Sequence, residues 1–299
     1  MKSERDGSIW LLLAVLALIW GSSFILMKRG LYHEEVPVLT PWQMATARLA
    51  IAWLALSPLL FRYAALFPRH WKPLLGTGLL GNGIPALLFA TAQTRIPSAL
   101  SGMLNSLTPL MTLLTGALFF ATPVRMVHVL GICIGLLGAM GLVLFGQADG
   151  LGGWSWYALL PVLGTLGYGF SGNIVKRHLH ALPPMATAAL ALTWMGPLAI
   201  GLALGSGLPE KLRTDPNAWN ALGHVAVLAV MSSAFALVLW NMLLQRTPAI
   251  RASMVTYLMP VVAIAWGLLD RESIGPIQLG MVALVLGAVW LVSAAERGR

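Results

Sequence analysis

The decapeptide MATARLAIAW at residues 44–53 returns as MATAALALTW at residues 185–194, with seven of ten positions identical at an offset of 141. Other pairs recur at nearly the same spacing, since Lys28 and Arg29 return as Lys176 and Arg177 at an offset of 148. A further set is related by an offset of 151 and pairs Arg95, Pro97, Pro109 and Gly116 with Arg246, Pro248, Pro260 and Gly267. Such self-similarity indicates an internal duplication. We therefore expect two related halves, residues 1–148 and 149–299.

The composition indicates that lipid is the solvent. Apolar residues make up 58% of the chain, charged residues only 10%, and the mean hydropathy is +0.80, whereas a soluble domain carries about 25% charged residues. Apolar runs of about 18 residues or more are long enough to cross a bilayer as helices. Five runs per half are predicted, at residues 9–27, 38–61, 74–93, 97–121, 124–145, 154–175, 183–204, 219–244, 249–269 and 274–295.

The odd number of spans in each half implies that the second half is inverted in the membrane relative to the first. Lys and Arg concentrate on cytoplasmic loops, and an N-terminus inside the cell places twelve of these residues inside and six outside. Both termini are therefore predicted to be cytoplasmic. The expected fold is an all-α membrane protein with ten transmembrane helices in two inverted five-helix repeats around a central cavity.

The charge and motif content disfavours several other classes of protein. The net charge of +9 could suit nucleic acid, but the basic residues are scattered at span ends, where they meet lipid headgroups. The single cysteine, Cys133, excludes an intrachain disulfide. The sequence has no HExxH motif and no Walker loop, and its acids are too dispersed for a catalytic dyad. We expect no enzyme activity, no metal, no cofactor and no nucleic-acid partner.

Polar and midspan aromatic side chains concentrate in the first, third, fourth, sixth, eighth and ninth spans. These six spans are expected to surround a solute pathway, because deeply placed amide groups need hydrogen-bonding partners. Each side chain also has a simpler explanation, such as a bond to its own helix or packing between helices. The predicted substrate-binding residues are Trp20, Ser23, Asn82, Asn105, Asn173, Trp240, Asn241 and Tyr257.

Arg48 is the single charged residue well inside a predicted span, and its repeat counterpart is Ala189. An Arg within the membrane is costly and marks a functional candidate, yet no acidic residue lies inside a span to pair with it. We expect a structural or gating role, in which Arg48 bonds backbone carbonyls at a helix break. The alternative is that it attracts a carboxylate of the substrate.

Proline residues indicate where the spans are weakened. Pro85, Pro109 and Pro260 lie within or near the ends of predicted spans, and Pro109 and Pro260 are related by the repeat. Because proline removes a helical hydrogen bond, paired breaks would allow the halves to rock between two states. A gating role is expected for these three residues, with static kinks as the alternative.

A resemblance to a known family rests on several of these features. The WGSSF run at residues 20–24, the Arg of the second span, the Pro of the fourth and ninth spans and the two five-helix halves resemble the drug/metabolite transporter superfamily in its ten-helix EamA-type branch. The chain is most similar to bacterial exporters of amino acids, particularly aromatic ones, which implies a multi-pass protein of the bacterial inner membrane. Family members usually end the fourth and ninth spans in Gly-Glu. Here the second half keeps the acid as Glu272, and the first half reads Ala-Thr-Pro at residues 121–123.

The absence of intramembrane acids narrows the expected solute. A bare cation would find no counter-charge, whereas Asn and Ser groups could hold a zwitterion such as an amino acid and Trp20, Trp240 and Tyr257 could cover an apolar side chain. The usual proton-coupling carboxylate is also missing. We expect a monomeric carrier in lipid that exports amino acids and similar small zwitterionic metabolites by facilitative alternating access. Alternatives are a proton-coupled drug or metabolite exporter, a structural membrane protein without flux, and a channel.

Overall fold

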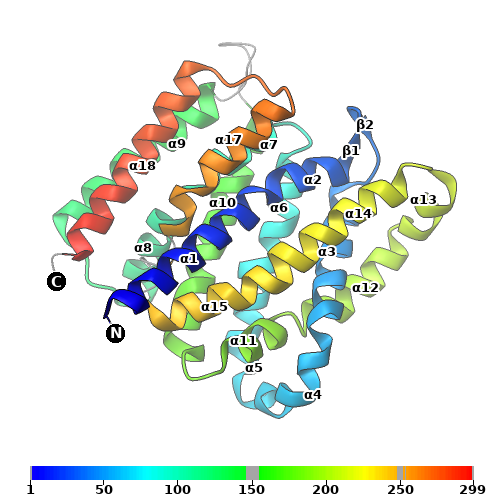
Figure 1. The fold of residues 1–299 in the computed structure, drawn as a ribbon, viewed down its shortest axis with the longest axis horizontal. Coiled ribbons are helices and arrows are strands. Elements are labelled where there is room, and N and C mark those ends of the chain that lie inside the picture. The colour runs from blue at the N-terminus through cyan, green and yellow to red at the C-terminus, as the bar shows by residue number, and fades with distance from the viewer. Residues whose placement is uncertain (1, 146–154, 248–251, 253, 298–299) are drawn as a thin grey trace.

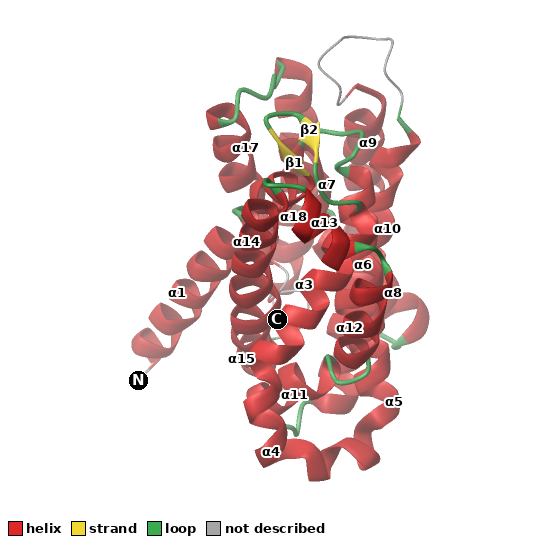
Figure 2. Ribbon diagram, turned by 90° about the vertical axis from the view of Figure 1, so that its right-hand side faces the viewer, coloured by secondary structure: helices red, strands yellow, loops and turns green. Residues whose placement is uncertain are grey.

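A computed structural model of the chain describes residues 2–145, 155–247, 252 and 254–297, and its helices pack into one bundle (Figure 1). A short antiparallel hairpin joins β1 (Tyr32–His33) to β2 (Val36–Pro37), with Tyr32 opposite Pro37. This hairpin lies at the end of the bundle opposite to α4, which Figure 2 shows at the bottom. The two ends of the bundle are therefore marked by different connections.

Local sequence explains where α3 begins. The Thr40 hydroxyl accepts a hydrogen bond from the Gln43 amide, and the Gln43 side chain accepts one from the Thr40 amide. This reciprocal capping box, followed by a proline in the first turn, is a strong helix start. The helices of the first part of the chain are α1 (Lys2–Gly21), α2 (Ser23–Leu31), α3 (Pro41–Leu56), α4 (Leu60–Tyr63), α5 (Phe67–Gly78), α6 (Ile84–Ala92), α7 (Ser98–Asn105), α8 (Thr108–Phe119) and α9 (Met126–Phe145), with 3₁₀ turns at Ser57–Leu59 and Ala64–Leu66 and a π-helical turn at Leu79–Gly83.

A comparable series of helices follows in the second part of the chain. Two π-helical turns, Val175–Leu179 and Ala229–Phe235, widen the helices that contain them. The elements are a 3₁₀ turn at Trp156–Ala158, α10 (Leu159–Ile174), α11 (Pro184–Ala191), α12 (Met195–Gly205), α13 (Leu208–Thr214), α14 (Ala218–Leu228), α15 (Ala236–Arg246), a 3₁₀ turn at Met254–Tyr257, α17 (Met259–Leu269) and α18 (Pro276–Arg297).

The described residues contain six helical stretches that are long and apolar enough to cross a membrane, or seven when α7 and α8 are counted as one bent span. The residues between Pro41 and Ala92 form one of these stretches, 52 residues long. The last two apolar helical segments, Val255–Leu269 and Pro276–Val292, are shorter. A helical multi-pass architecture is therefore present, and its division into ten spans stays a prediction.

Small residues on α9 let it pack closely against α18, and the two helices lie side by side in Figure 1. A Cβ atom on Gly138 would come within 2.8 Å of Val285, and one on Gly131 within 2.4 Å of Val292. The glycines of α18, Gly280 and Gly287, do not lie at this close contact. Neither has another group within 4 Å of its Cβ position. The α9 glycines alone provide the close approach.

A matched pair of substitutions tests this packing. Gly138→Ala should lower the thermal stability of the detergent-solubilised protein by the equivalent of about 1 to 3 kcal/mol, because overpacking outweighs the better helix propensity of alanine. Gly287→Ala should leave stability unchanged or raise it, because the site is open. Equal unfolding temperatures for the two variants would contradict the assigned packing.

Candidate functional site

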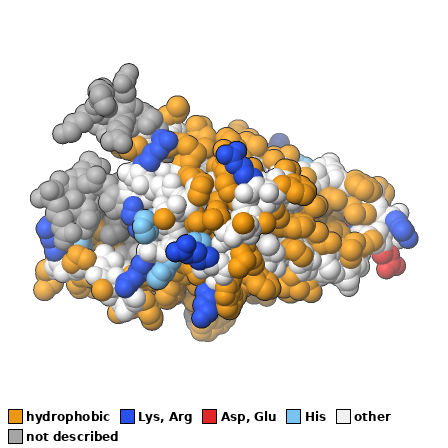
Figure 3. Space-filling view, turned by 90° about the horizontal axis from the view of Figure 1, so that it is seen from below, with side chains coloured by type: hydrophobic (Ala, Val, Ile, Leu, Met, Phe, Trp, Pro, Cys, Tyr) orange, Lys and Arg blue, Asp and Glu red, His pale blue; other side chains and the backbone are white. Residues whose placement is uncertain are grey.

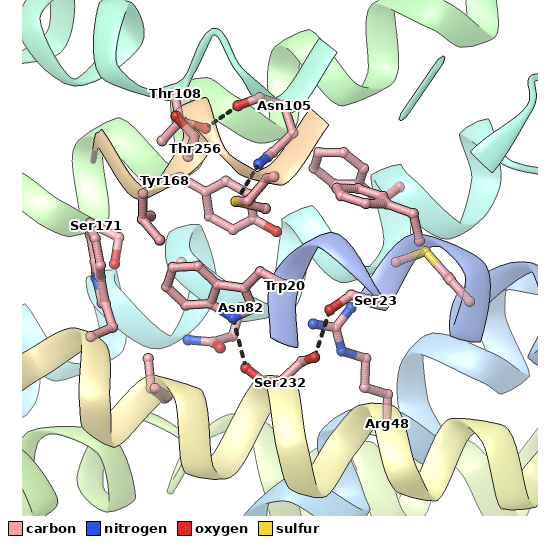
Figure 4. A pocket seen from close by; sticks show the side chains of 18 residues that line it. Trp20, Ser23, Arg48, Asn82, Asn105, Thr108, Tyr168, Ser171, Ser232 and Thr256 are labelled. Atoms are coloured by element: carbon pink, nitrogen blue, oxygen red, sulfur yellow. Dashed lines mark hydrogen bonds between the residues drawn. The ribbon is translucent and has the colours of Figure 1, made fainter. Parts of the chain in front are cut away.

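A cavity of about 100 Å³ lies at the centre of the bundle, where seven parts of the chain meet (Figure 4). Its walls come from α1 and α2, α3, the π-helical turn Leu79–Gly83 with α6, the break between α7 and α8, α10, the π-helical turn Ala229–Phe235 with α15, and the start of α17 with the turn before it. Both polar and aromatic side chains face it. It therefore offers a small solute hydrogen bonds and apolar contact together.

Five of the eight residues predicted to bind substrate line this cavity, namely Trp20, Ser23, Asn82, Asn105 and Trp240. They come from four parts of the chain that are far apart in the sequence, since Trp20 and Ser23 are near neighbours. The six spans expected to surround the pathway all contribute. A seventh segment, α3, was not expected among them, and it contributes Arg48.

The other three predicted residues do not line the cavity. The Asn173 side-chain amide donates to the carbonyls of Thr112 and Gly169, at 2.9 Å each, so it joins α10 to α8. The Asn241 amide donates to the carbonyl of Leu237 one turn earlier in its own helix. Tyr257 packs within an apolar cluster formed mainly by α7, α8, α9 and α18. Direct contact with a solute is therefore not assigned to these three residues.

The indole of Trp20 is held in a fixed orientation. Its Nε1–H donates to the carbonyl of Ser232 at 3.1 Å, and its ring meets the edge of the Trp240 ring at a centroid distance of 5.5 Å. The hydroxyls of Ser23 and Ser232 are 2.6 Å apart. These contacts tie α1 and α2 to the turn Ala229–Phe235, and both indoles line the cavity.

A second group of aromatic rings forms another part of the cavity wall. Phe24, Phe89 and Tyr168 follow one another at centroid distances of 5.9 Å and 6.0 Å, and the last pair is stacked. Neither phenylalanine was among the residues predicted to bind substrate. A Phe within a lipid-spanning helix carries no signal in the sequence, because it is equally suited to face lipid, another helix or a cavity.

Two π-helical turns bring polar groups to the cavity. The turn Leu79–Gly83 supplies Gly81 and Asn82, and the turn Ala229–Phe235 supplies Ser232. The extra residue in such a turn disturbs the regular ladder of backbone hydrogen bonds, and π-helical turns are frequent at functional sites for that reason. The carbonyl of Ser232 serves here as the acceptor for Trp20.

The cavity retains polar atoms without partners. Among the buried atoms of the described residues, the Asn82 Nδ2 and Asn105 Oδ1 make no hydrogen bond. The Asn105 Nδ2 has only the weakly accepting sulfur of Met259, at 3.6 Å. An amide buried without partners costs about 1 to 3 kcal/mol per group. A bound solute or water that pairs with these amides would recover part of that cost.

Arg48 lies in the cavity wall, and its guanidinium points toward the region of Ser23 in Figure 4. Its Nε–H donates to the hydroxyl of Ser233 at 2.7 Å. Among the described residues, this hydroxyl is the hydrogen-bond partner of Arg48. The expected bonds to backbone carbonyls at a helix break are absent there. The position of Arg48 therefore differs from the expectation that its helix lies outside the pathway.

The three prolines expected at helix breaks each lie in the first turn of a new helix. Pro85 is the second residue of α6, which follows the π-helical turn, Pro109 is the second residue of α8, and Pro260 is the second residue of α17, which follows a 3₁₀ turn. At Pro109 the chain bends by 40° between α7 and α8. All three breaks adjoin cavity residues, because Asn82, Asn105 and Met259 lie within four positions of them.

A partly buried ion-pair cluster joins three helix ends at the end of the bundle that carries the hairpin. We name it the Lys28–Glu272 cluster, and it consists of Lys28, Arg29, Asp270 and Glu272. The Lys28 ammonium is 2.7 Å from the Asp270 carboxylate and 3.3 Å from that of Glu272, and Arg29 also contacts Asp270. The Glu272 carboxylate accepts the amides of Ser98 and Ala99 at 3.0 and 2.9 Å, where it caps α7.

The opposite end of the bundle has related contacts without acidic groups. The Lys176 ammonium donates to the carbonyls of Leu244 and Thr247 at 2.9 and 3.0 Å. The Arg177 guanidinium donates to the carbonyl of Phe120 at 3.2 Å. The repeated Lys-Arg pair thus bonds neighbouring helix ends at both ends of the bundle, and within the part of the chain that the structure describes only the Lys28–Glu272 cluster uses carboxylates as partners.

A helical multi-pass bundle around an enclosed polar and aromatic cavity is an architecture of membrane transporters. Comparison with known families agrees, since the EamA-like transporter family matches residues 7–144 and again residues 155–294. The chain therefore belongs to the EamA-like transporter family.

Several curated proteins are similar along nearly the whole chain. The uncharacterized inner membrane transporter YedA of Escherichia coli K12 is 28% identical over 290 residues, covering 95% of this chain and 90% of its own length. A probable amino-acid metabolite efflux pump of the same strain is 26% identical, with 95% and 94% covered. One crystal structure superposes with a TM-score of 0.65 at 18% identity, covering 97% of this chain and 98% of the other, which supports the fold alone.

Proposed function

We propose that the protein is a carrier that exports amino acids and similar small zwitterionic metabolites across the bacterial inner membrane. The observation that carries this proposal is the central cavity, where unpaired amides and large aromatic rings from distant helices converge. The similarity to probable amino-acid metabolite efflux pumps supports the solute class. We further propose that one chain suffices for transport, because both halves of the internal repeat lie within this one chain.

We propose ten spans in two inverted halves, residues 1–148 and 149–299. A helical stretch of 52 residues is far longer than the roughly 20 residues that cross a bilayer, so Pro41–Ala92 is best divided into two spans at the short turns around α4. The pairing of helices also follows the repeat. Exchanging the two halves turns the contact of α1 with α17 into the contact of α10 with α8. The same exchange turns the contact of α3 with α12 into itself, and likewise the contact of α9 with α18.

The proposed orientation places both termini in the cytoplasm. The basic residues Arg62, Arg69 and Lys72 are exposed in or near α4 and α5, and Figure 3 shows Lys, Arg and His side chains across the face seen from below, with acidic side chains only at one edge. Excess basic residues favour the cytoplasmic side. The Lys28–Glu272 cluster would then lie at the periplasmic end.

We propose that transport proceeds by alternating access, with the Lys28–Glu272 cluster closing the periplasmic end of the cavity. Met27 lines the central cavity, whereas the adjacent Lys28 lines a second, more open hollow of about 570 Å³ together with Arg95 and Glu272. We propose that the cluster separates the two spaces. Opening it requires Lys28 to leave its carboxylates, and Pro85, Pro109 and Pro260 are proposed to absorb the accompanying helix movements.

The expected coupling follows from the charges of the cavity. No Asp or Glu is among the described residues that line it, so the group that most often carries a coupled proton is missing. Purified protein in liposomes should equilibrate labelled amino acids down their gradient, and an imposed pH gradient alone should not concentrate them. Severalfold accumulation driven by the pH gradient would favour the proton-coupled alternative, and no flux of any solute would favour a structural protein.

A further inference from the structure

We infer that Arg48 binds the carboxylate of the transported solute and thereby excludes solutes that lack an anionic group. This inference rests on the proposed function, because it assumes that the central cavity is the solute site. It extends that function by assigning one residue to charge selection and by predicting a requirement for a carboxylate.

The guanidinium of Arg48 is held in a geometry that suits a carboxylate. The Nε–H of Arg48 donates to Ser233, whose side chain is almost fully buried on the turn Ala229–Phe235. This bond orients the planar group. Its terminal nitrogens, Nη1 and Nη2, make no hydrogen bond within the described residues. Because they are also not fully buried, they remain accessible in the cavity wall. A planar pair of N–H donors matches the two oxygens of a carboxylate.

The positive charge of Arg48 is not balanced by an acidic residue of the cavity. Arg48 has no ion pair among the described residues, and neither Asp nor Glu is among the described cavity residues. A cation held within the membrane without a counter-charge is costly. A purely structural Arg would be expected to saturate its donors with backbone carbonyls, as Lys176 does with Leu244 and Thr247. We therefore assign the counter-charge of Arg48 to the carboxylate of the solute.

Other groups of the cavity suit the amine and the side chain of an amino acid. The unpaired Asn105 Oδ1 is an acceptor in the same cavity, and it suits an ammonium or another N–H donor. The aromatic rings, including Trp20 and Phe89, suit an apolar side chain. These neutral groups can hold an amino group without discriminating strongly for it. The carboxylate is thus expected to matter more for affinity than the amine.

The test measures binding by purified, detergent-solubilised protein through competition against radiolabelled leucine and phenylalanine. The competitors are the amides leucinamide and phenylalaninamide, which lack a carboxylate, and the acids 4-methylpentanoate and 3-phenylpropionate, which lack an amine. The two sizes are included because a cavity of about 100 Å³ has limited room. Flux of the same amino acids is measured in parallel in liposomes.

Wild-type protein should bind the acids about tenfold to one-hundredfold more tightly than the amides, the range expected for a charge-assisted hydrogen bond. Arg48→Gln should reduce this ratio to about one, and Arg48→Lys should keep part of it because the charge remains. Ser233→Ala should lower the ratio less than Arg48→Gln, since it only frees the guanidinium. Arg62→Gln is the matched control, because Arg62 is exposed on α4, and its ratio should equal that of the wild type.

The possible outcomes separate this inference from the proposed function. Flux with equal affinity for acids and amides, or an unchanged ratio in Arg48→Gln, would overturn the role of Arg48 and leave the carrier intact. Carboxylate-selective binding that depends on Arg48, without flux, would support the inference and contradict the carrier. Absence of both binding and flux for every compound would overturn both.

Discussion

Replacing Trp20 or Trp240 by alanine should weaken the binding of bulky apolar solutes by about 1 to 3 kcal/mol, which is roughly tenfold or more in Kd. Both rings line the cavity, and their mutual contact at 5.5 Å and the bond from Trp20 to Ser232 hold them in place. Truncation removes apolar contact area that only a large solute uses. The affinity for small solutes such as alanine should therefore fall less.

The measurement compares dissociation constants for phenylalanine and alanine in wild type, the two single variants and the double variant. Because the two indoles touch, their effects should not be additive, with a coupling of about 0.5 to 1.5 kcal/mol. Leu136→Ala on the exposed face of α9 is the control and should leave both constants unchanged. An unchanged preference for phenylalanine in all three Trp variants would place the solute elsewhere.

Replacing Glu272 by glutamine should open the periplasmic end of the cavity more often. The Glu272 side chain is only 5% exposed and is bonded to Lys28 and to the start of α7. Loss of one partner from a buried ion pair costs about 3 to 5 kcal/mol when the other charge stays buried. Here the variant can relieve that cost by moving Lys28 toward water, and this movement separates α2 from α17.

The matched control is Glu35→Gln, because Glu35 also contacts Lys28 but is 83% exposed and 3.6 Å away. Exposed pairs contribute about 0 to 1 kcal/mol. A cysteine at Met27, in a Cys133→Ser background, should react with an external membrane-impermeant thiol reagent at least tenfold faster in the Glu272→Gln variant, whereas the Glu35→Gln variant should match the parent. Equal rates in all three proteins would rule out this cluster as the barrier.

The sequence predicted which helices meet at the centre better than it predicted which side chains face the cavity. The amides of Asn105 and Asn173 both lie in midspan positions of helices that border the cavity, yet only Asn105 faces it. Half a turn of a helix, about two residues, separates an inward from an outward direction. In a membrane span both directions are apolar, so hydrophobic periodicity gives little guidance.

Arg48 illustrates a different limit. Its isolation as a charge was visible in the sequence, but its span was not among the six expected to surround the pathway. The structure instead brings α3 against the turn Ala229–Phe235, where Ser233 receives the guanidinium. This contact joins residues separated by 185 positions, and no local pattern in the sequence encodes it.

The duplication was readable because both copies keep small residues and prolines at fixed positions, whereas the packing of the last helix was not. Gly138 and Gly287 look equivalent in the sequence, but only Gly138 meets another helix closely. Equivalent glycines can therefore face different surroundings in the two halves.

Counterflow in proteoliposomes tests the central claim most directly, because it requires one site that is exposed alternately to the two sides of the membrane. Vesicles loaded with unlabelled leucine should transiently accumulate external labelled leucine above its equilibrium level, and Arg48→Gln should abolish this overshoot while Arg62→Gln retains it. A monotonic approach to equilibrium at a rate that does not saturate with concentration would indicate a channel, and an overshoot of wild-type size in Arg48→Gln would contradict the assigned site.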